Sequence, residues 1–172
     1  MKRLLLAFAL LTLSTQAQAQ VQACSGLLNH SYTSLQGKPV NLCDFAGRPI
    51  LVVNTASKCG YTPQFEKLEA LHKRYQGRGL VMLGFPSNDF NQELATNQEI
   101  AQFCKRTYDV TFPMFAKVSV RGGSQHPVYK FLTAQKGGVS CNSNKFLVGK
   151  DGQVIEKFGS TVNPDAPEFV SS

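Results

Sequence analysis

Metal-binding spacings are absent from this sequence of 172 residues. Its five cysteines include no Cys-X-X-Cys pair, and its three histidines lie far apart along the chain. Zinc and related metals are usually held by cysteine and histidine ligands at short, regular spacings. The sequence therefore predicts no metal site and no cofactor, and it favours redox chemistry of the cysteine thiols themselves.

Runs of one charge are also absent. Lys and Arg number 18 against 11 Asp and Glu, a formal net charge of +7, but the basic residues are scattered with no aromatic stripe beside them. Proteins that bind nucleic acids gather basic residues on one face or along one helix. We therefore expect no nucleic-acid partner and interpret the surplus as a solvated basic surface that can attract anionic partners.

The one long apolar block lies at the start of the chain. Lys2 and Arg3 precede apolar residues 4–13, and a polar stretch then leads to Ala17-Gln18-Ala19. The block is too short to cross a bilayer, and the whole pattern is typical of a secretory signal peptide. We expect residues 1–19 to be removed after export, to the periplasm, and residues 20–172 to form one domain without a transmembrane segment. An alternative interpretation is lipidation, with an anchor at Cys24.

An exported chain meets an oxidising compartment, in which disulfides persist. Cys24 and Cys43 flank a hairpin that we predict between residues 29 and 45, and a bond between them would hold the N-terminal arm to this hairpin. Because the number of cysteines is odd, at least one thiol is unpaired or shared between states. The sequence leaves the full connectivity open.

One cysteine lies at the junction of a strand and a helix. Apolar residues 50–53 predict a buried strand, and Thr62-Pro63 predicts the cap and first position of a helix that continues to Tyr75. Cys59 lies between them. The N–H groups at the start of a helix and the cation of Lys58 favour the thiolate, the nucleophilic form of cysteine. Cys59 is therefore a candidate nucleophile, although a lone cysteine can also be a buried packing residue.

The remaining pattern predicts a single α/β domain with a mixed sheet. Residues 80–85 predict a second strand, parallel to the first because a helix connects them. Thr96-Asn97-Gln98-Glu99 has the spacing of a capping box, which opens a helix that carries Cys104. The other predicted elements are a strand over Phe112–Val120, a short helix over Pro127–Leu132, and a hairpin of strands Lys145–Val148 and Gln153–Phe158.

Three long stretches are specific enough to compare with known families: NTASKCGYTPQ, LGFPSNDFNQE and EIAQFCKRTYDVTFPMFAK. They resemble, in that order, the catalytic loop, the second signature and the following segment of the glutathione peroxidases. Members of this family are thiol peroxidases with a thioredoxin-like fold. The resemblance covers most of the mature chain and implies a mixed central sheet flanked by helices, with an N-terminal hairpin.

The resemblance also implies roles for individual residues. Cys59 would be the peroxidatic cysteine, in the place where some members have selenocysteine. Gln92 matches the active-site glutamine, in a loop one residue shorter and with Leu94 in place of a proline. Asn142 matches the asparagine that hydrogen-bonds the reactive sulfur. Cys104 falls where the members that use thioredoxin carry their resolving cysteine.

Two further expectations follow from the resemblance. The short connection between Tyr129 and Cys141 has no room for the insertion by which tetrameric members associate, which implies a monomer. The family keeps the peroxidatic and resolving cysteines too far apart to bond in the reduced state. The helix that carries Cys104 would therefore have to open locally before Cys104 reaches Cys59.

The chain departs from the family at Cys141, which stands at the position of a tryptophan. The whole chain has no tryptophan, and Ser143 and Asn144 replace bulkier residues that are usual nearby. Loss of the indole N–H would weaken catalysis in a shielded pocket. Alternatively, Cys141 lies close enough to Cys59 to trap it in a disulfide, either as a second resolving cysteine or as a dead end.

The predicted function is that of a thiol peroxidase for hydrogen peroxide or organic hydroperoxides. The Cys59 thiolate would attack the peroxide and become a sulfenic acid, which would condense with Cys104 into a disulfide. A thioredoxin-like protein or glutathione would then return the electrons. The alternatives are a thiol redox sensor or transmitter with low turnover, and a relic in which Cys59 is inert.

Overall fold

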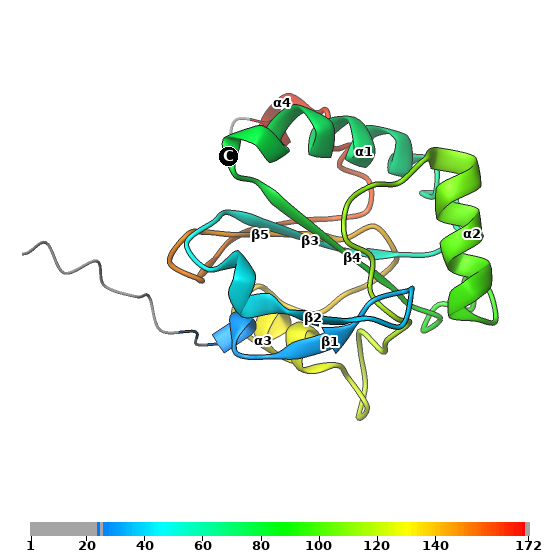
Figure 1. The fold of residues 1–172 in the computed structure, drawn as a ribbon, viewed down its shortest axis with the longest axis horizontal. Helices are drawn as coiled ribbons and strands as arrows, with labels where there is room; N and C mark the ends of the chain where they lie inside the picture. The colour runs from blue at the N-terminus through cyan, green and yellow to red at the C-terminus, as the bar shows by residue number, and fades with distance from the viewer. Residues whose placement is uncertain (1–23, 25, 171–172) are drawn as a thin grey trace, which may run out of the picture.

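A computed structural model describes residue 24 and residues 26–170 of the chain. A four-stranded sheet forms the centre of the domain (Figure 1). Strands β3 (Ile50–Thr55) and β4 (Val81–Pro86) are parallel, and β5 (Lys145–Val148) and β6 (Val154–Phe158) are antiparallel, in the order β4-β3-β5-β6. The predicted mixed sheet is confirmed. The predicted signal peptide, residues 1–19, lies outside the described residues.

Helices cover both faces of the sheet (Figure 1). Helices α1 (Gln64–Tyr75) and α2 (Asn97–Tyr108) lie on one face, and α3 (Pro127–Lys136) lies on the other with the hairpin of β1 (Ser31–Thr33) and β2 (Pro39–Asn41). The short elements are η1 (Gly26–Leu28), η2 (Leu42–Phe45), η3 (Gln76–Arg78) and the single turn α4 (Pro167–Val170).

Strand residues alternate between two apolar cores. Ile50 and Val52 of β3 pack in the core beside α3, whereas Leu51 and Val53 pack in the core beside α1. Because successive side chains of a strand point to opposite faces, one continuous apolar run serves both cores. Lys145 is the cross-strand partner of Val53, so the side chain of this lysine lies on the α1 face.

The predicted helix ends are correct to within a few residues. The capping box of α2 is present, with Thr96 Oγ1 accepting the Glu99 N–H, and Pro127 begins α3 directly after His126. Helix α1 begins at Gln64, with Pro63 at the N-cap and no side-chain cap bond. The prediction that Thr62 caps this helix was wrong. The Thr62 hydroxyl instead accepts the Cys59 N–H and donates to the Ala56 carbonyl, both in the preceding loop.

The strand predicted over Phe112–Val120 was wrong. This segment touches β4 at Met114 and the hairpin at Phe115, each by an isolated bridge, and Pro113 has no backbone N–H to extend a ladder. It lies very close to β4, because a Cβ atom added to Gly84 would be 2.1 Å from Met114 Sδ. The segment is therefore extended between two neighbours without pairing continuously with either.

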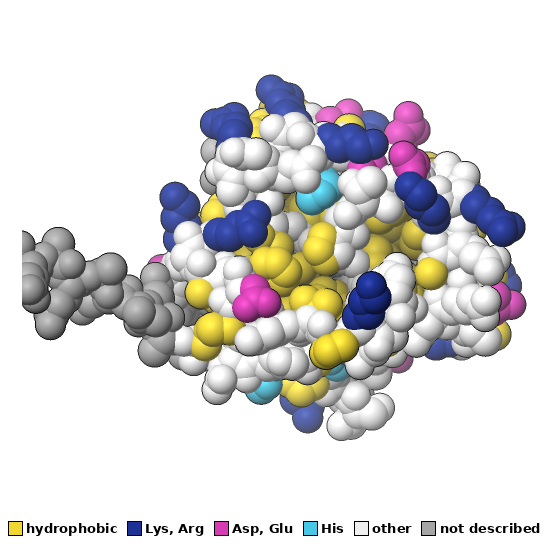
Figure 2. All heavy atoms as spheres, in the orientation of Figure 1, with side chains coloured by type: hydrophobic (Ala, Val, Ile, Leu, Met, Phe, Trp, Pro, Cys, Tyr) yellow, Lys and Arg dark blue, Asp and Glu magenta, His cyan; other side chains and the backbone are white. Residues whose placement is uncertain are grey.

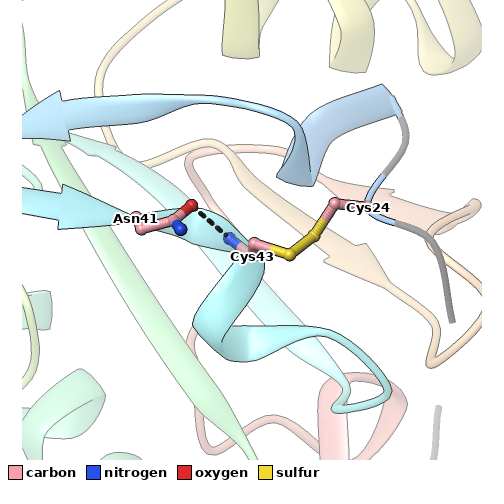
Figure 3. Close-up of a disulfide and its surroundings, with 3 residues drawn as sticks. All are labelled: Cys24, Asn41 and Cys43. Atoms are coloured by element: carbon pink, nitrogen blue, oxygen red, sulfur yellow. Dashed lines mark hydrogen bonds between the residues drawn. A yellow bond between two sulfur atoms is a disulfide. The ribbon is translucent and has the colours of Figure 1, made fainter. Parts of the chain in front are cut away.

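The predicted disulfide between Cys24 and Cys43 is confirmed (Figure 3). The two cysteines are 19 residues apart in sequence, and the bond joins the chain before η1 to η2. Asn41 Oδ1 accepts the Cys43 N–H at 3.0 Å and so caps η2. The bond therefore holds the N-terminal arm against the end of the hairpin, and closing a loop of this size stabilises a fold by about 3 kcal/mol.

Basic side chains are spread around the face shown in Figure 2, with apolar atoms between them, and they form no single patch there. Within the part of the chain that the structure describes, no helix is long and apolar enough to cross a membrane. The same residues contain no group of three His, Cys, Asp or Glu side chains placed to hold a metal ion.

His126 gives the fold a specific sensitivity to acid. Its ring lies 4.2 Å from the Tyr32 ring and 5.7 Å from the Phe85 ring, and its Nδ1 has no hydrogen-bond partner. Burial, with a smaller contribution from His30, lowers the pKa of His126 to about 4. The unfolded chain therefore binds a proton at this histidine more readily than the folded chain does.

We expect the free energy of unfolding to fall as the pH drops from about 6.5 to 4, by about 1–2 kcal/mol at this half-buried site. Urea unfolding across this range measures the effect. In His126→Phe, which keeps a ring among the aromatic neighbours, this part of the pH dependence should disappear. His30→Gln, at an exposed histidine, should retain most of it. An unchanged pH dependence in His126→Phe would contradict the assignment.

Candidate active site

Cys59 lies on the loop that leaves the carboxyl end of β3 and enters α1, and the residue is only 8% exposed. Its backbone N–H donates to Thr62 Oγ1 at 3.0 Å, and the Thr62 hydroxyl donates to the Ala56 carbonyl at 2.8 Å. The Tyr61 N–H is directed at Cys59 Sγ, 3.4 Å away. The loop is thus fixed by its own hydrogen bonds, and a backbone donor on the sulfur stabilises negative charge there.

Gln92 and Asn142 meet beside this loop. The Gln92 carbonyl accepts the N–H of Lys58, the residue before Cys59, at 2.8 Å. The Asn142 side-chain amide donates to Gln92 Oε1 at 3.0 Å, and Asn142 is fully buried. The structure therefore brings these two amides together, with Gln92 bonded to the loop that carries Cys59. The predicted hydrogen bond from Asn142 to the sulfur stays a prediction, since in this structure the amide is directed at Gln92.

Asn54, which the sequence reading missed, holds the loop of residues 141–144. Its carbonyl accepts the Ser143 N–H at 2.7 Å, its Oδ1 accepts the Asn144 N–H at 3.0 Å, and its Nδ2 donates to the Cys141 carbonyl at 3.0 Å. A polar residue inside the apolar run of β3 was the available signal, because a buried amide needs partners. Cys141 is partly exposed on this loop, and its role toward Cys59 stays a prediction.

Glu93 is a second residue that the sequence reading missed. Its buried Oε1 accepts the Ser57 N–H at 3.0 Å and the Leu94 N–H at 2.7 Å, so it joins the loop of Gln92 to the loop of Cys59. Burial raises the pKa of Glu93 above its ordinary value. Its only sequence signal was its position directly after the candidate glutamine.

Cys104 lies outside this hydrogen-bonded group. It is 3% exposed on α2, as predicted, and it packs in the core beside α1. It lines a cleft of about 270 Å³ to which neither Cys59 nor Gln92 nor Asn142 contributes. Burial first, and then the charge of Glu93, raises the pKa of the Cys104 thiol to about 12. Cys59 and Cys104 are both free in this structure, burial favours a protonated Cys104 thiol, and its approach to Cys59 through local opening stays a prediction.

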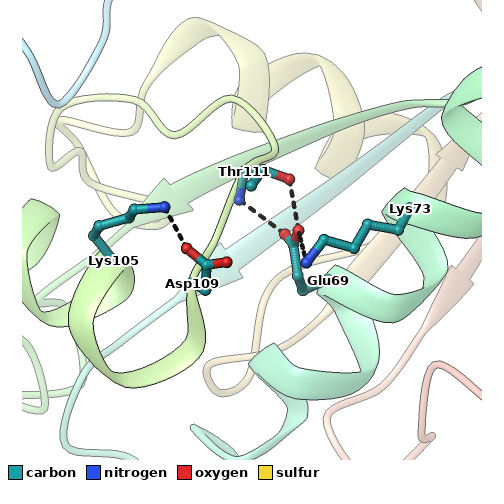
Figure 4. A network of polar contacts seen from close by, with 5 residues as sticks. All are labelled: Glu69, Lys73, Lys105, Asp109 and Thr111. Atoms are coloured by element: carbon teal, nitrogen blue, oxygen red, sulfur yellow. Dashed lines mark hydrogen bonds and ion pairs between the residues drawn. The ribbon is translucent and has the colours of Figure 1, made fainter.

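The segment that follows α2 is anchored to α1 (Figure 4). Glu69 on α1 accepts the backbone N–H of Thr111 at 2.9 Å and the Thr111 hydroxyl at 2.5 Å, and it pairs with Lys73 at 3.3 Å. An ion pair between Lys105 and Asp109 closes the last turn of α2. Glu69 is 4% exposed whereas Thr111 is exposed, so the bonds between them are shielded from water only on the Glu69 side. If α2 opens while Thr111 stays bonded to Glu69, the movement is confined to the helix itself.

Comparison with known proteins places the chain in a family. The sequence pattern of the family described as GSHPx: Glutathione peroxidase matches residues 27–133, which include Cys59, Gln92 and Cys104. Glutathione peroxidase-like peroxiredoxin gpx1 of Schizosaccharomyces pombe is 49% identical over 135 residues, 75% of this chain and 85% of the relative. Hydroperoxy fatty acid reductase gpx1 of Synechocystis is 44% identical over 156 residues, 84% of this chain and 92% of the relative.

Solved structures give the same result for the fold. The crystal structure of Trgpx in apo form has a TM-score of 0.67 and 32% identity, covering 86% of this chain and 95% of that one. A thioredoxin family protein of Chlorobium tepidum, a thiol:disulfide interchange protein, has a TM-score of 0.61 at 16% identity, over 83% of this chain and 90% of that one. The latter likeness concerns the fold alone and confirms the thioredoxin-like architecture. The chain belongs to the glutathione peroxidase family.

Proposed function

We propose that this protein is a thiol peroxidase in which Cys59 reduces hydrogen peroxide or an organic hydroperoxide. The observation that carries the proposal is the loop geometry at Cys59, whose sulfur receives the Tyr61 N–H, together with the paired amides of Gln92 and Asn142, of which Gln92 is bonded to the same loop at Lys58. The thiolate attacks one peroxide oxygen and the O–O bond breaks. Cys59 becomes a sulfenic acid, and the other oxygen takes a proton and leaves as water or an alcohol.

The amide side chains suit this step because they donate hydrogen bonds without adding negative charge beside the sulfur. Gln92 and Asn142 are proposed to orient the peroxide once it displaces their mutual bond. An organic hydroperoxide is a reasonable substrate because the Synechocystis relative is named a hydroperoxy fatty acid reductase.

The second step is proposed to use Cys104. Its thiol condenses with the Cys59 sulfenic acid, releasing water and forming a Cys59–Cys104 disulfide, which a thioredoxin-like protein or glutathione then reduces. A dithiol protein reduces such a disulfide well, which favours the thioredoxin-like reductant. Cys141 is the competing partner for Cys59, because it adjoins Asn142 on the loop beside the site.

We propose that the protein works as a monomer after export to the periplasm. The Cys24–Cys43 disulfide supports export, because such bonds persist in oxidising compartments. It also argues against a lipid anchor at Cys24, since a sulfur engaged in a disulfide is unavailable for a thioether to lipid. The short connection between α3 and β5 supports the monomer.

Peptide mass spectrometry after one equivalent of hydrogen peroxide tests the proposal. The starting protein would have the Cys24–Cys43 bond intact and its other thiols reduced, with Cys59→Ser as control. We expect a Cys59–Cys104 disulfide. A Cys59–Cys141 bond would mean that Cys141 either resolves the sulfenic acid or blocks the catalytic cycle. A persistent Cys59 sulfenic acid would favour glutathione as the direct second substrate. An unmodified Cys59 would overturn the peroxidase assignment.

A further inference from the structure

Lys145 is a lysine in an unusual environment. It has no exposed surface, at the start of β5 on the face covered by α1. Within the described part of the chain, no carboxylate lies within ion-pair distance of its ammonium group. Burial lowers its pKa to about 8. A buried ammonium without a counterion costs free energy, so its presence calls for a reason other than stability.

The acceptors of the Lys145 ammonium are two neutral oxygens. Nζ donates to Gln64 Oε1 and to the Val162 carbonyl, the latter at 2.6 Å. Gln64 is the first residue of α1, five positions after Cys59, and its own Nε2 donates to the Ser160 carbonyl at 2.8 Å. Lys145 therefore fixes the point at which the Cys59 loop becomes a helix.

The same contacts continue to the loop that carries Asn142. Asn144 Nδ2 donates to Ser160 Oγ at 3.0 Å and to the Cys141 carbonyl at 2.8 Å. Ser160 is thus bonded both to Gln64 and to Asn144, and Lys145 directly follows Asn144 in the chain. One buried network therefore joins the end of the Cys59 loop to the loop of residues 141–144.

We propose that Lys145 is a positioning residue for peroxide reduction, whose ammonium group holds Gln64 and, through Ser160 and Asn144, sets the position of Asn142 relative to Cys59. Asn54 holds the 141–144 loop to β3, and its Nδ2 also donates to Asn142 Oδ1 at 3.4 Å, but it makes no described hydrogen bond to the start of α1. Among the described hydrogen bonds, only the Lys145 network ties that loop to Gln64. This inference rests on the proposed function of Cys59.

The test compares Lys145→Met with the matched control Lys150→Met, at an exposed lysine in the turn between β5 and β6. Methionine keeps the length of the side chain and removes the charge and the donors. The rate constant for oxidation of Cys59 by hydrogen peroxide should fall by about 10- to 100-fold in Lys145→Met, because small displacements of positioning groups have effects of this size. The rate is measured in a single turnover by quenching and mass spectrometry.

Stability supplies the readout that separates positioning from a structural role. Methionine removes a buried charge, which is favourable, but it leaves Gln64 Oε1 and the Val162 carbonyl without this donor, which is unfavourable, so we expect the urea midpoint of Lys145→Met to change little. A lowered midpoint, or an unchanged oxidation rate, would overturn the inference. If wild-type Cys59 itself fails to react, the proposed function fails instead, and the two failures are therefore distinguishable.

Gln64→Leu provides a second route that leaves Lys145 in place. It removes the side-chain amide that accepts the hydrogen bond from Lys145 and donates to Ser160, and we expect a similar loss of the Cys59 oxidation rate. In the double variant the loss should be no greater than in the larger single variant, because both changes disconnect one network. Losses that multiply in the double variant would show two independent effects and would contradict the inference.

Discussion

Cys59→Ser should lower peroxide turnover by at least about 10³-fold, because a serine hydroxyl is a far weaker nucleophile than a thiolate and removal of a catalytic nucleophile has effects of this order. The substitution exchanges sulfur for a smaller atom at a residue that is 8% exposed, and the Thr62 bond to the backbone of residue 59 is unaffected. The fold should therefore persist. Turnover is measured with hydrogen peroxide and a thioredoxin-coupled assay.

Cys141→Ser is the matched control for this experiment. It removes another free thiol, on the loop beside the site, but leaves the Cys141 carbonyl bonds to Asn54 and Asn144 in place. We expect it to retain turnover within a few-fold of the wild type if Cys104 resolves the sulfenic acid. Wild-type turnover in Cys59→Ser would exclude Cys59 as the nucleophile.

Cys104→Ser should lower thioredoxin-coupled turnover by about 100-fold or more while leaving the first reaction with peroxide intact. The sulfenic acid then lacks its internal partner, and thiol–disulfide exchange with a dithiol protein has no disulfide to attack. Cys104 makes none of the hydrogen bonds that hold the loop around Cys59, so we expect this loop to keep its structure in the variant. Trapping with a sulfenic-acid reagent should give one equivalent at Cys59, and repeated peroxide should drive it to the sulfinic acid.

The buried position of Cys104 explains why its contribution to turnover should be separable from the first reaction of Cys59 with peroxide. Burial raises the pKa of this thiol to about 12, so we expect that resolution by Cys104 would need a local opening of α2, a step that oxidation of Cys59 does not need. Undiminished thioredoxin-coupled turnover in Cys104→Ser would show that Cys141 or an external thiol, and not Cys104, reacts with the Cys59 sulfenic acid. The double variant Cys104→Ser/Cys141→Ser distinguishes these two, since only direct reduction by an external thiol survives it.

Many elements were predictable because their signals are local. The apolar runs of β3 and β4, the Thr96–Glu99 capping box of α2 and the turn between β5 and β6 each depend on neighbours within a few residues. The position of Cys59 between a strand and a helix followed from the same local pattern. The pairing of Cys24 with Cys43 was also expected, because both flank one short hairpin.

Long-range partners explain the errors and omissions. The extended segment around Met114 has the composition of a strand, but it is joined to β4 and to the hairpin by isolated bridges and scattered hydrogen bonds instead of a continuous ladder, which no local pattern indicates. Asn54 binds a loop almost 90 residues further along the chain. Thr62 was expected to cap α1, yet its hydroxyl turned back to the Ala56 carbonyl because the chain bends there.

The sequence by itself determined most of the strands and helices and the family, and it singled out Cys59 as the candidate nucleophile, since these depend on local propensity and on continuous motifs. Only the tertiary structure decided which polar groups are buried together. Lysine is usually exposed, and nothing near residue 145 in the sequence indicates an ammonium group enclosed beneath α1. Burial, and the pKa changes that follow from it, depend on atoms brought together from distant parts of the chain.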